Sequence, residues 1–306
     1  MYDVIIIGGG PAGVAAGVYA GRKKLKTLLI TENFGGQSAV SADIENWIGV
    51  KKMTGLELAK MLEAHIRSQK DVEVKMPEKV NKVIRARNSF KVATSKDTYQ
   101  ARTLIIVSGS SRKELDVPGE KKFKGKGMAY CSTCDAPVFK DKIVAVIGSG
   151  NSAFEAIIDL ISYAKKIYLL SRSGLRADPL IQEKVKKSSK VTIVYNAEIK
   201  EIVGDKFVSG LKYLDKKTNK IRKLAVEGVF VEIGTMPNSE IFRNLVKINT
   251  AGEIVVDRKT MATSCLGVFA AGDVTDEIYK QNNISAGDGV IAILSAYNYL
   301  LKNKKL

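Results

Sequence analysis

The sequence predicts an α/β protein made of two similar units, and three observations lead to this prediction. An apolar run, a glycine-rich turn and an apolar helix follow one another twice, at residues 3–20 and 142–163. Each copy continues with short alternating runs, which are typical of a small antiparallel meander. Each copy then closes with an apolar strand and a glycine, at Gly109 and at Gly234. This self-similarity indicates an internal duplication.

The first copy begins with the apolar run 3–7, which is typical of a strand buried on both faces of a parallel sheet. The fingerprint G-x-G-x-x-G follows as Gly8, Gly10 and Gly13, then a helix is expected at 14–20 and a strand at 25–30. Glu32 stands just past that strand. In this context the glycines let the backbone approach a pyrophosphate, and Glu32 can bond a ribose hydroxyl. The first copy is therefore predicted to bind FAD or NAD.

The second copy repeats the pattern with a strand at 142–147, the fingerprint 148–153, a helix at 153–163 and a strand at 167–170. At the position of Glu32 it holds Ser171-Arg172-Ser173, and Arg176 lies close by. Arginine and hydroxyl groups at the end of this strand would suit a 2′-phosphate, and hence NADP rather than NAD. The alternative is a solvated basic loop.

The remaining elements follow from local pattern. The long connection with 35–37 and 45–47 is expected to be functional, and a helix is expected at 55–69. The meanders are expected at 72–74, 80–86, 90–94 and 99–102, and again at 191–195, 198–203 and 210–214, with closing strands at 104–107 and 229–233. We expect a turn at 235–238, a hairpin strand at 252–257, a strand at 268–271 and a final helix at 285–301. Asp273 at a strand end could hold a ribityl or phosphate hydroxyl, or it is a plain loop carboxylate.

Cys131 and Cys134 are two of only 3 cysteines, and their C-x-x-C spacing favours a small, exchangeable disulfide ring. A structural zinc wants four ligands, and only Cys265 and His65 remain, so no metal is expected. Asp135 adjoins the second sulfur. It is either a turn or cap residue or a proton donor and acceptor for a thiolate.

The composition and charge of the chain limit the classes of binding partner that are expected. The net charge of +17 comes from 49 Lys+Arg against 32 Asp+Glu that are scattered along the chain, so no nucleic-acid partner is expected. A lysine-rich surface is the plain interpretation, and steering toward an acidic protein partner is the alternative. No apolar run approaches the roughly 18 residues of a membrane span. No signal peptide is visible, and sparse cysteines suit a reducing cytoplasm.

Together these residues resemble the low-molecular-weight thioredoxin reductases, a branch of the pyridine nucleotide–disulfide oxidoreductase flavoproteins, over nearly the whole chain. The motifs that carry the resemblance are 8–13, 35–37, 45–47, 131–135, 148–153, 270–273 and 279–281. The resemblance implies a homodimer with an FAD domain of residues 1–112 and 246–306. An NAD(P)H domain of residues 113–245 is inserted between them and carries the redox-active pair.

The resemblance also implies roles for single residues. Cys134 is the sulfur that meets the flavin, Cys131 attacks the disulfide of thioredoxin, and Asp135 is the acid. Two cofactor sets follow from the fingerprints and the resemblance together. The FAD set is Gly8, Gly10, Pro11, Ala12, Gly13, Glu32, Gly36, Gln37, Asn46, Gly109, Gly272, Asp273, Lys280 and Gln281. The NADP set is Gly148, Gly150, Asn151, Ser152, Ala153, Ser171, Arg172, Ser173, Arg176 and Gly234.

The chain departs from the family pattern at the nicotinamide motif, where the usual His-Arg-Arg is Ser171-Arg172-Ser173. One arginine is kept there and Arg176 also matches, so NADPH is the expected donor, while the departure leaves NADH or another electron donor open. The predicted function is transfer of electrons from NAD(P)H through FAD to Cys131–Cys134, and on to a thioredoxin-like protein. The alternatives are an NAD(P)H oxidase, a reductase of another disulfide such as a peroxiredoxin system, and a redox-sensing or nucleic-acid-binding protein without turnover.

Overall fold

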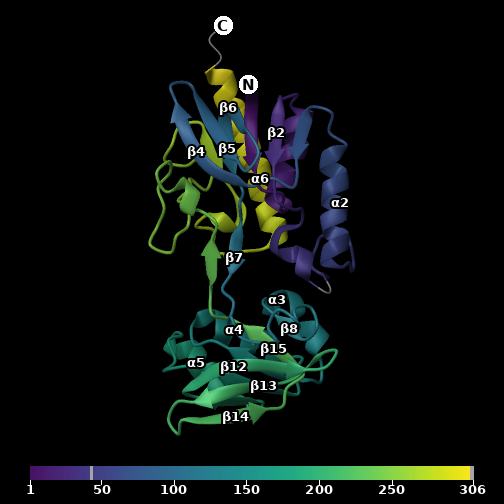
Figure 1. Ribbon diagram of the computed structural model, residues 1–306, viewed down its shortest axis with the longest axis vertical. Helices are drawn as coiled ribbons and strands as arrows, with labels where there is room; N and C mark the ends of the chain where they lie inside the picture. Colours follow the sequence, from purple (N-terminus) through teal and green to yellow (C-terminus); the bar gives the residue numbers. More distant parts are fainter. Residues whose placement is uncertain (42–43, 304–306) are drawn as a thin grey trace. The chain divides into compact units, whose positions relative to one another are not determined.

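The computed structural model describes residues 1–41 and 44–303, and these form two compact units (Figure 1). Within the described residues, the first unit comprises Met1–Ala39, Trp47–Ser111 and Met236–Leu306, and the second comprises Val40–Asn46 and Arg112–Thr235. Each unit is built on a largely parallel sheet with helices, and each has antiparallel strands as well. The predicted α/β class with two Rossmann-like units is confirmed.

The sheet of the first unit has the strand order β3-β2-β1-β6-β5-β4, with β17 also paired to β6. Strands β3, β2, β1, β6 and β17 pair in parallel, whereas β5 is antiparallel to both β6 and β4. The bounds are β1 Tyr2–Ile7, β2 Thr27–Ile30, β3 Val72–Lys75, β4 Val80–Ala86, β5 Ser89–Thr94, β6 Thr98–Ile106 and β17 Val268–Ala270.

Two details of the predicted first meander are wrong. The run 72–74 is β3, which pairs in parallel with β2 and belongs to the buried sheet. The runs 99–102 and 104–107 are one strand, β6, because no turn residue separates them. Thr103, fully buried between the two runs, donates from Oγ1 to the carbonyl of Asp3 at 2.8 Å and so keeps the strand beside β1.

The helices of the first unit are α1 Pro11–Arg22, α2 Gly55–Arg67 and α6 Asn282–Lys302, with the 3₁₀ turns η1 Gly36–Val40, η3 Glu240–Phe242 and η4 Gly272–Val274. Thr54 and Glu57 form a capping box at the start of α2. Residues 252–257 form only isolated bridges through Ile254, so the predicted strand there is wrong.

Helix α6 is the one described helix that is long and apolar enough to cross a membrane by length and composition, a test that core helices also pass. Its buried residues recur at helical spacing, from Ser285 through Ala292 to Leu300. A Cβ at Gly289 would overlap the backbone carbonyl of Ala12, so α6 packs closely against the first turn of α1.

The second unit has the parallel sheet β11-β10-β9-β15-β8 and a separate antiparallel sheet β12-β13-β14. The strands are β8 Met128–Ala129, β9 Ile143–Ile147, β10 Lys166–Leu170, β11 Val191–Val194, β12 Ala197–Gly204, β13 Val208–Asp215, β14 Lys220–Leu224 and β15 Gly228–Val231. The helices are α3 Ser132–Asp135, α4 Asn151–Ile161 and α5 Pro179–Lys186, with the 3₁₀ turn η2 Ala136–Phe139. The predicted meander strand at 191–195 is instead β11, parallel to β10.

The chain passes between the units through two strands, β7 Ser110–Arg112 and β16 Thr235–Pro237, which pair with each other. The turn expected at 235–238 is therefore wrong. Asn238 fixes the end of β16, because its N–H donates to Gly109 at 3.0 Å and its Nδ2 donates to Ser108 at 2.9 Å. Residues 236–245 consequently group with the first unit, whereas the predicted domain boundary lies at 245/246.

Candidate functional site

The carboxyl ends of four parallel strands lie at one edge of the first sheet. Ile7 of β1 is in register with Ile30 of β2 and Ile106 of β6, and Ile106 is in register with Ala270 of β17. Side chains and turns that follow these strands meet at that edge, which is where ligands bind in open α/β sheets. The structure thus brings together five predicted FAD residues, namely Gly8, Glu32, Gly109, Gly272 and Asp273.

The first glycine fingerprint makes a tight turn with one open position. Gly8 has φ +128°, and a Cβ there would overlap the carbonyl of Val107, while a Cβ at Gly13 would overlap the carbonyl of Gly8. A Cβ at Gly10 would meet nothing within 4 Å. Gly10 is also the N-cap of α1 and makes no side-chain cap, so the positive helix end faces this open space.

Helix α6 supplies the opposite wall of the same site. A Cβ at Gly272 would lie 3.3 Å from the Cβ of Ala12 and 3.2 Å from Oγ of Ser285. Ser285 donates from Oγ to Oδ1 of Asp273 at 3.2 Å. Asp288, one turn further along α6, has an Oδ2 that is buried and has no hydrogen-bond partner among the described residues. Burial raises the pKa of Asp288, with Glu277 adding to the effect.

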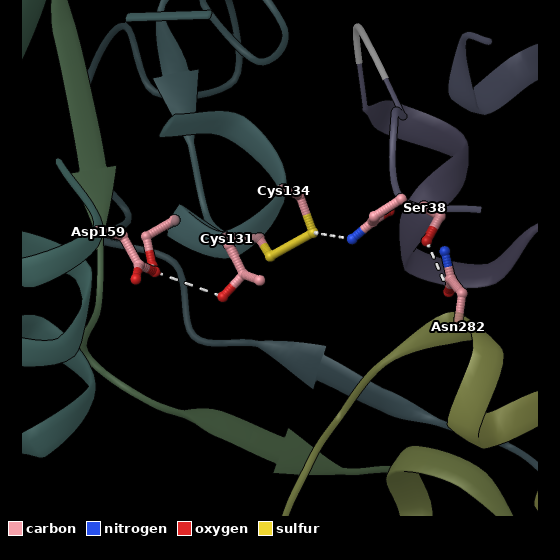
Figure 2. The surroundings of a disulfide bond; sticks show 8 residues. Ser38, Cys131, Cys134, Asp159 and Asn282 are labelled. Carbon is pink, nitrogen blue, oxygen red and sulfur yellow. Dashed lines mark hydrogen bonds between the residues drawn. A yellow bond between two sulfur atoms is a disulfide. The ribbon is translucent and has the colours of Figure 1, made fainter. Parts of the chain in front are cut away.

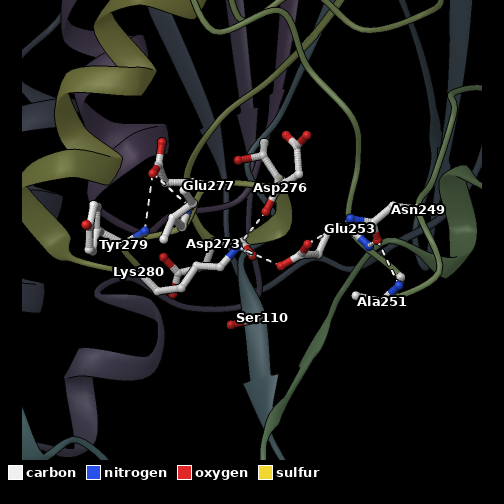
Figure 3. A network of polar contacts seen from close by, with 12 residues as sticks. Ser110, Asn249, Ala251, Glu253, Asp273, Asp276, Glu277, Tyr279 and Lys280 are labelled. Carbon is white, nitrogen blue, oxygen red and sulfur yellow. Dashed lines mark hydrogen bonds and ion pairs between the residues drawn. The ribbon is translucent and has the colours of Figure 1, made fainter. Parts of the chain in front are cut away.

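Other predicted FAD residues have protein partners. Figure 3 shows Lys280, whose ammonium donates to the carbonyl of Thr275 at 2.5 Å and pairs with Glu253 at 3.0 Å. Lys280 therefore joins Glu253 to the segment between η4 and α6. Gln37 donates from Nε2 to Oγ of Ser110 at 2.8 Å, and the exposed Glu32 lies 3.6 Å from the ammonium of Lys79.

The segment after Gln37 also meets the start of α6. Ser38 of η1 donates from Oγ to Oδ1 of Asn282 at 3.0 Å, as Figure 2 shows, and Gln281 is the N-cap of α6. A Cβ at Gly36 would have only the Cα of Gly10 near it, at 3.7 Å. The open backbone at Gly10 suits a pyrophosphate, and the orphaned buried oxygen of Asp288 suits a hydroxyl donor of the ligand, so these residues fit FAD.

The second sheet repeats this edge. Ile147 of β9 is in register with Leu170 of β10 and with Val231 of β15. A Cβ at Gly148 would overlap the carbonyl of Glu232, whereas a Cβ at Gly150 would meet nothing within 4 Å. Gly150 is the N-cap of α4, again without a side-chain cap. The edge brings together the predicted residues Gly148, Gly150, Asn151, Ser152, Ala153, Ser171, Arg172, Ser173 and Gly234.

The basic loop after β10 is anchored to the second fingerprint. Arg176 donates from Nε to Oγ of Ser149 at 3.1 Å and from its backbone N–H to the carbonyl of Ser149 at 2.7 Å. Ser171 is fully buried and donates from Oγ to the carbonyl of Ser173 at 2.7 Å, so its hydroxyl shapes the loop. Arg172 and Ser173, which follow β10, are exposed. This arrangement fits a phosphorylated ribose beside Arg172 and Arg176.

Cys131 and Cys134 form a disulfide with their Cα atoms 5.3 Å apart. Cys131 is the N-cap of the single helical turn α3, and the N–H of Asp135 donates to the carbonyl of Cys131 at 2.9 Å. Asn46, one of the predicted FAD residues, groups with the second unit, and its Nδ2 lies 3.9 Å from Sγ of Cys134. The third cysteine, Cys265, is a buried free thiol in the first unit.

Two acidic residues of the second unit have no motif in the sequence that marks them as part of the redox site. Asp159 of α4 points toward the ring in Figure 2 and accepts hydrogen bonds from both residues between the cysteines. Burial raises the pKa of Glu232, just after β15, to about 7. Arg112 opposes this shift, and Asp135, Asp159 and Glu155 add to it. The four carboxylates and Arg112 therefore share one electrostatic environment.

Comparison with known proteins places this geometry in a family. Residues 2–289 match the family model described as pyridine nucleotide-disulphide oxidoreductase. NADH dehydrogenase of Bacillus subtilis is 41% identical over 99% of this chain and 59% of its own length. An alkyl hydroperoxide reductase component of Pseudomonas aeruginosa is 41% identical over 98% of this chain and 58% of its own length. The chain thus spans about three-fifths of the curated relatives it matches.

Solved structures match over their full length. Thioredoxin reductase from Streptococcus pyogenes superposes with a TM-score of 0.92 at 35% identity and covers 99% of both chains. Thioredoxin reductase from Giardia duodenalis gives a TM-score of 0.90 at 32% identity, over 98% of this chain and 99% of its own. The chain therefore belongs to the pyridine nucleotide-disulphide oxidoreductase family, whose members bind FAD and a pyridine nucleotide.

Proposed function

We propose that the chain is a thioredoxin-disulfide reductase that takes electrons from NADPH and passes them to a thioredoxin-like protein. The observation that carries this proposal is the position of the disulfide. Cys131 and Cys134 lie in the same unit as the second nucleotide fingerprint, at Gly148 to Ala153. The full-length similarity to thioredoxin reductases supports the same choice of substrate.

FAD would be held at the edge of the first sheet by the turn at Gly10, the first turn of α1, and Asp273 and Asp288 near the start of α6. When bound, FAD supplies hydride acceptance from the nicotinamide and two electrons for a disulfide. NADPH would be held at the edge of the second sheet, with its pyrophosphate at Gly150 and its 2′-phosphate beside Arg172 and Arg176. NADH is the alternative donor, because Arg172 stands where the family's usual motif has more basic residues.

The chain's own residues then carry the exchange with the partner. In the dithiol form, the thiolate of Cys131 attacks one sulfur of the partner disulfide, which gives a mixed disulfide and releases a partner thiolate. Asp135 gives that thiolate a proton. Cys134 next gives its proton to the ionised Asp135, and its thiolate attacks the sulfur of Cys131. This attack re-forms the ring and releases the second partner sulfur as a thiolate, which takes the proton from Asp135. Two electrons and two protons pass to the partner in each cycle.

The second candidate function is reduction of a peroxidase disulfide. The relative named as an alkyl hydroperoxide reductase subunit favours it, at 41% identity. The same cysteines and cofactors would serve, and only the protein that accepts the electrons would differ. The chain's share of about three-fifths of those relatives means that the rest of such a protein has no counterpart in these 306 residues.

We further propose a homodimer in a reducing cytoplasm. The redox pair needs a compartment in which a dithiol persists, and the net charge of +17 would speed association with an acidic protein partner. Sedimentation equilibrium tests the dimer, and an association rate that fails to fall with added salt would contradict the steering.

Steady-state assays with two acceptors test the proposed function. NADPH oxidation should be fast with an oxidised thioredoxin and should depend on Cys131 and Cys134. It should be at least about tenfold slower with an oxidised peroxiredoxin at equal concentration. Fast turnover with peroxiredoxin alone would favour the second candidate. Turnover that is unaffected in Cys131→Ser would show that the disulfide is structural, and the proposal would fail.

A further inference from the structure

The two residues between the cysteines are both held by one carboxylate. Ser132 donates from Oγ to Oδ2 of Asp159 at 2.8 Å, and Thr133 donates from Oγ1 to the same oxygen at 3.4 Å. Ser132 is buried, with 8% of its surface exposed, so its hydroxyl needs a partner inside the protein. Asp159 lies 27 residues further along the chain, near the end of α4. The ring is therefore fastened to the helix that begins at the second fingerprint.

The element that carries the cysteines depends on outside support. Helix α3 is four residues long, and its N-cap Cys131 makes no side-chain cap. A single helical turn is unstable alone, because fixing its backbone is not repaid by its own hydrogen bonds. Hydrogen bonds to a charged acceptor are among the stronger ones in proteins. The two bonds to Asp159 thus hold α3 to α4.

The hydrogen bonds to Asp159 affect the stability of the disulfide and of the dithiol differently. When the S–S bond is broken, only the surrounding contacts keep the two sulfurs close, and closeness raises the effective concentration of one thiol at the other. A carboxylate also disfavours a nearby thiolate, and two carboxylates adjoin the pair: Asp159 accepts from the residues between the cysteines, and Asp135 follows Cys134 on α3. Position and charge both favour the closed ring over the open dithiolate.

We propose that Asp159 is a positioning residue that holds the Cys131–Cys134 ring through Ser132 and Thr133 and thereby keeps the dithiol strongly reducing. The proposal deepens the proposed reductase function, since it concerns the poise of the same disulfide. A dithiol that closes readily into a disulfide is a better electron donor to a partner.

The test is redox equilibration of the holoenzyme at pH 7 with mixtures of oxidised and reduced dithiothreitol. The S–S bond of the ring breaks as an S–S bond forms in dithiothreitol, with transfer of two electrons and two protons. The dithiol fraction is read by maleimide trapping and peptide mass spectrometry, which separates Cys131 and Cys134 from the buried Cys265. Each couple equilibrates with the buffer separately, so the bound flavin does not enter this readout.

Asp159→Ala should shift the equilibrium constant about tenfold toward the dithiol, which is about 30 mV for a two-electron couple. Asp159→Asn keeps an acceptor for Ser132 and should shift it less than Asp159→Ala does. Adding Ser132→Ala to Asp159→Ala should change it no further, because both changes remove the same bond. The double variant Ser132→Ala, Thr133→Val removes the two donors and should shift the equilibrium constant in the same direction. It replaces Asp159→Ala in the test if that variant does not fold.

Glu155→Gln is the matched control, because it removes an exposed charge one turn earlier on α4, and it should stay within about twofold of the original protein. If Asp159→Ala lowered the melting temperature but left the equilibrium constant within about twofold, Asp159 would be merely structural and the inference would fail. If the original protein's disulfide could not be reduced at all, the proposed reductase function would fail instead.

Discussion

Replacement of Glu232 by Gln should make the second unit more stable at neutral and alkaline pH. Glu232 follows β15, and its backbone carbonyl lies against Gly148. Burial raises its pKa from 4.5 to about 7 in the folded protein. When folding raises the pKa of a carboxyl, its contribution to stability is fully present at a pH below the pKa of the unfolded chain. The contribution is lost as the pH rises through the pKa of the folded protein. The sensitive window is therefore about pH 4.5 to 7.

The size of the effect follows from the shift. A difference of roughly 2.5 pKa units corresponds to about 3 kcal/mol, at about 1.36 kcal/mol per unit. Glu232 is partly exposed, and Arg112 compensates its charge to some extent, so about 2 kcal/mol is the expected gain in Glu232→Gln at pH 8. At pH 4.5 the original carboxyl is largely neutral, and the two proteins should differ by less than about 0.5 kcal/mol.

Urea unfolding at pH 4.5 and pH 8 measures this difference. Hydrogen exchange of peptides from β9 and β15 reports on the second unit, which matters because two units can unfold separately. Glu183→Gln, on the exposed surface of α5, is the control and should give the same small change at both pH values. If Glu232→Gln were less stable than the original protein at pH 8, the charge would be well compensated and the reasoning would be wrong.

Four other substitutions test the cofactor and redox sites. Cys134→Ser should abolish reduction of a thioredoxin-like protein but leave NADPH oxidation by an artificial acceptor, and equal loss of both in the two assays would make the cysteine structural. Arg172→Ala should raise the KM for NADPH about tenfold and leave the KM for NADH nearly unchanged, since only NADPH has a 2′-phosphate. An equal change in both KM values would show that Arg172 does not bind the 2′-phosphate. Gly10→Ala should fold, because its Cβ meets nothing and φ is −77°, yet lose most bound FAD in an absorbance assay. Gly13→Ala, whose Cβ would overlap Gly8, should fail to fold at all, and a folded, yellow Gly13→Ala would contradict the packing.

Much of the fold could be predicted because its signals are local. Each glycine fingerprint sits between an apolar strand and a helix, and this order alone implies a parallel sheet with a ligand edge. The register of Ile7, Ile30 and Ile106 then brings the predicted residues together. The missed elements lack such signals. Strand β14 reads Lys220–Leu224 with four exposed residues, so it shows no apolar alternation, and it is visible only through its pairing with β13.

The site was harder to predict wherever a role depends on contacts distant in sequence. Ser132 and Thr133 look like ordinary spacer residues, and only the packing of α3 on α4 gives them Asp159 as a partner. The raised pKa of Glu232 depends on burial, which no motif records. Lys280 matched a family motif, but the contacts of its ammonium with Glu253 and with the carbonyl of Thr275 could not be read from that motif.

Anaerobic titration of the purified holoenzyme with NADPH, followed by flavin absorbance, tests the central claim most directly. If electrons pass from the nicotinamide through FAD to the ring, about two equivalents of NADPH should be consumed per chain, because FAD and the disulfide each accept two electrons. A Cys131→Ser, Cys134→Ser double variant should consume about one. Equal consumption by both proteins would show that the disulfide receives no electrons from the flavin, and no bleaching by NADPH or NADH would show that the electrons come from another donor.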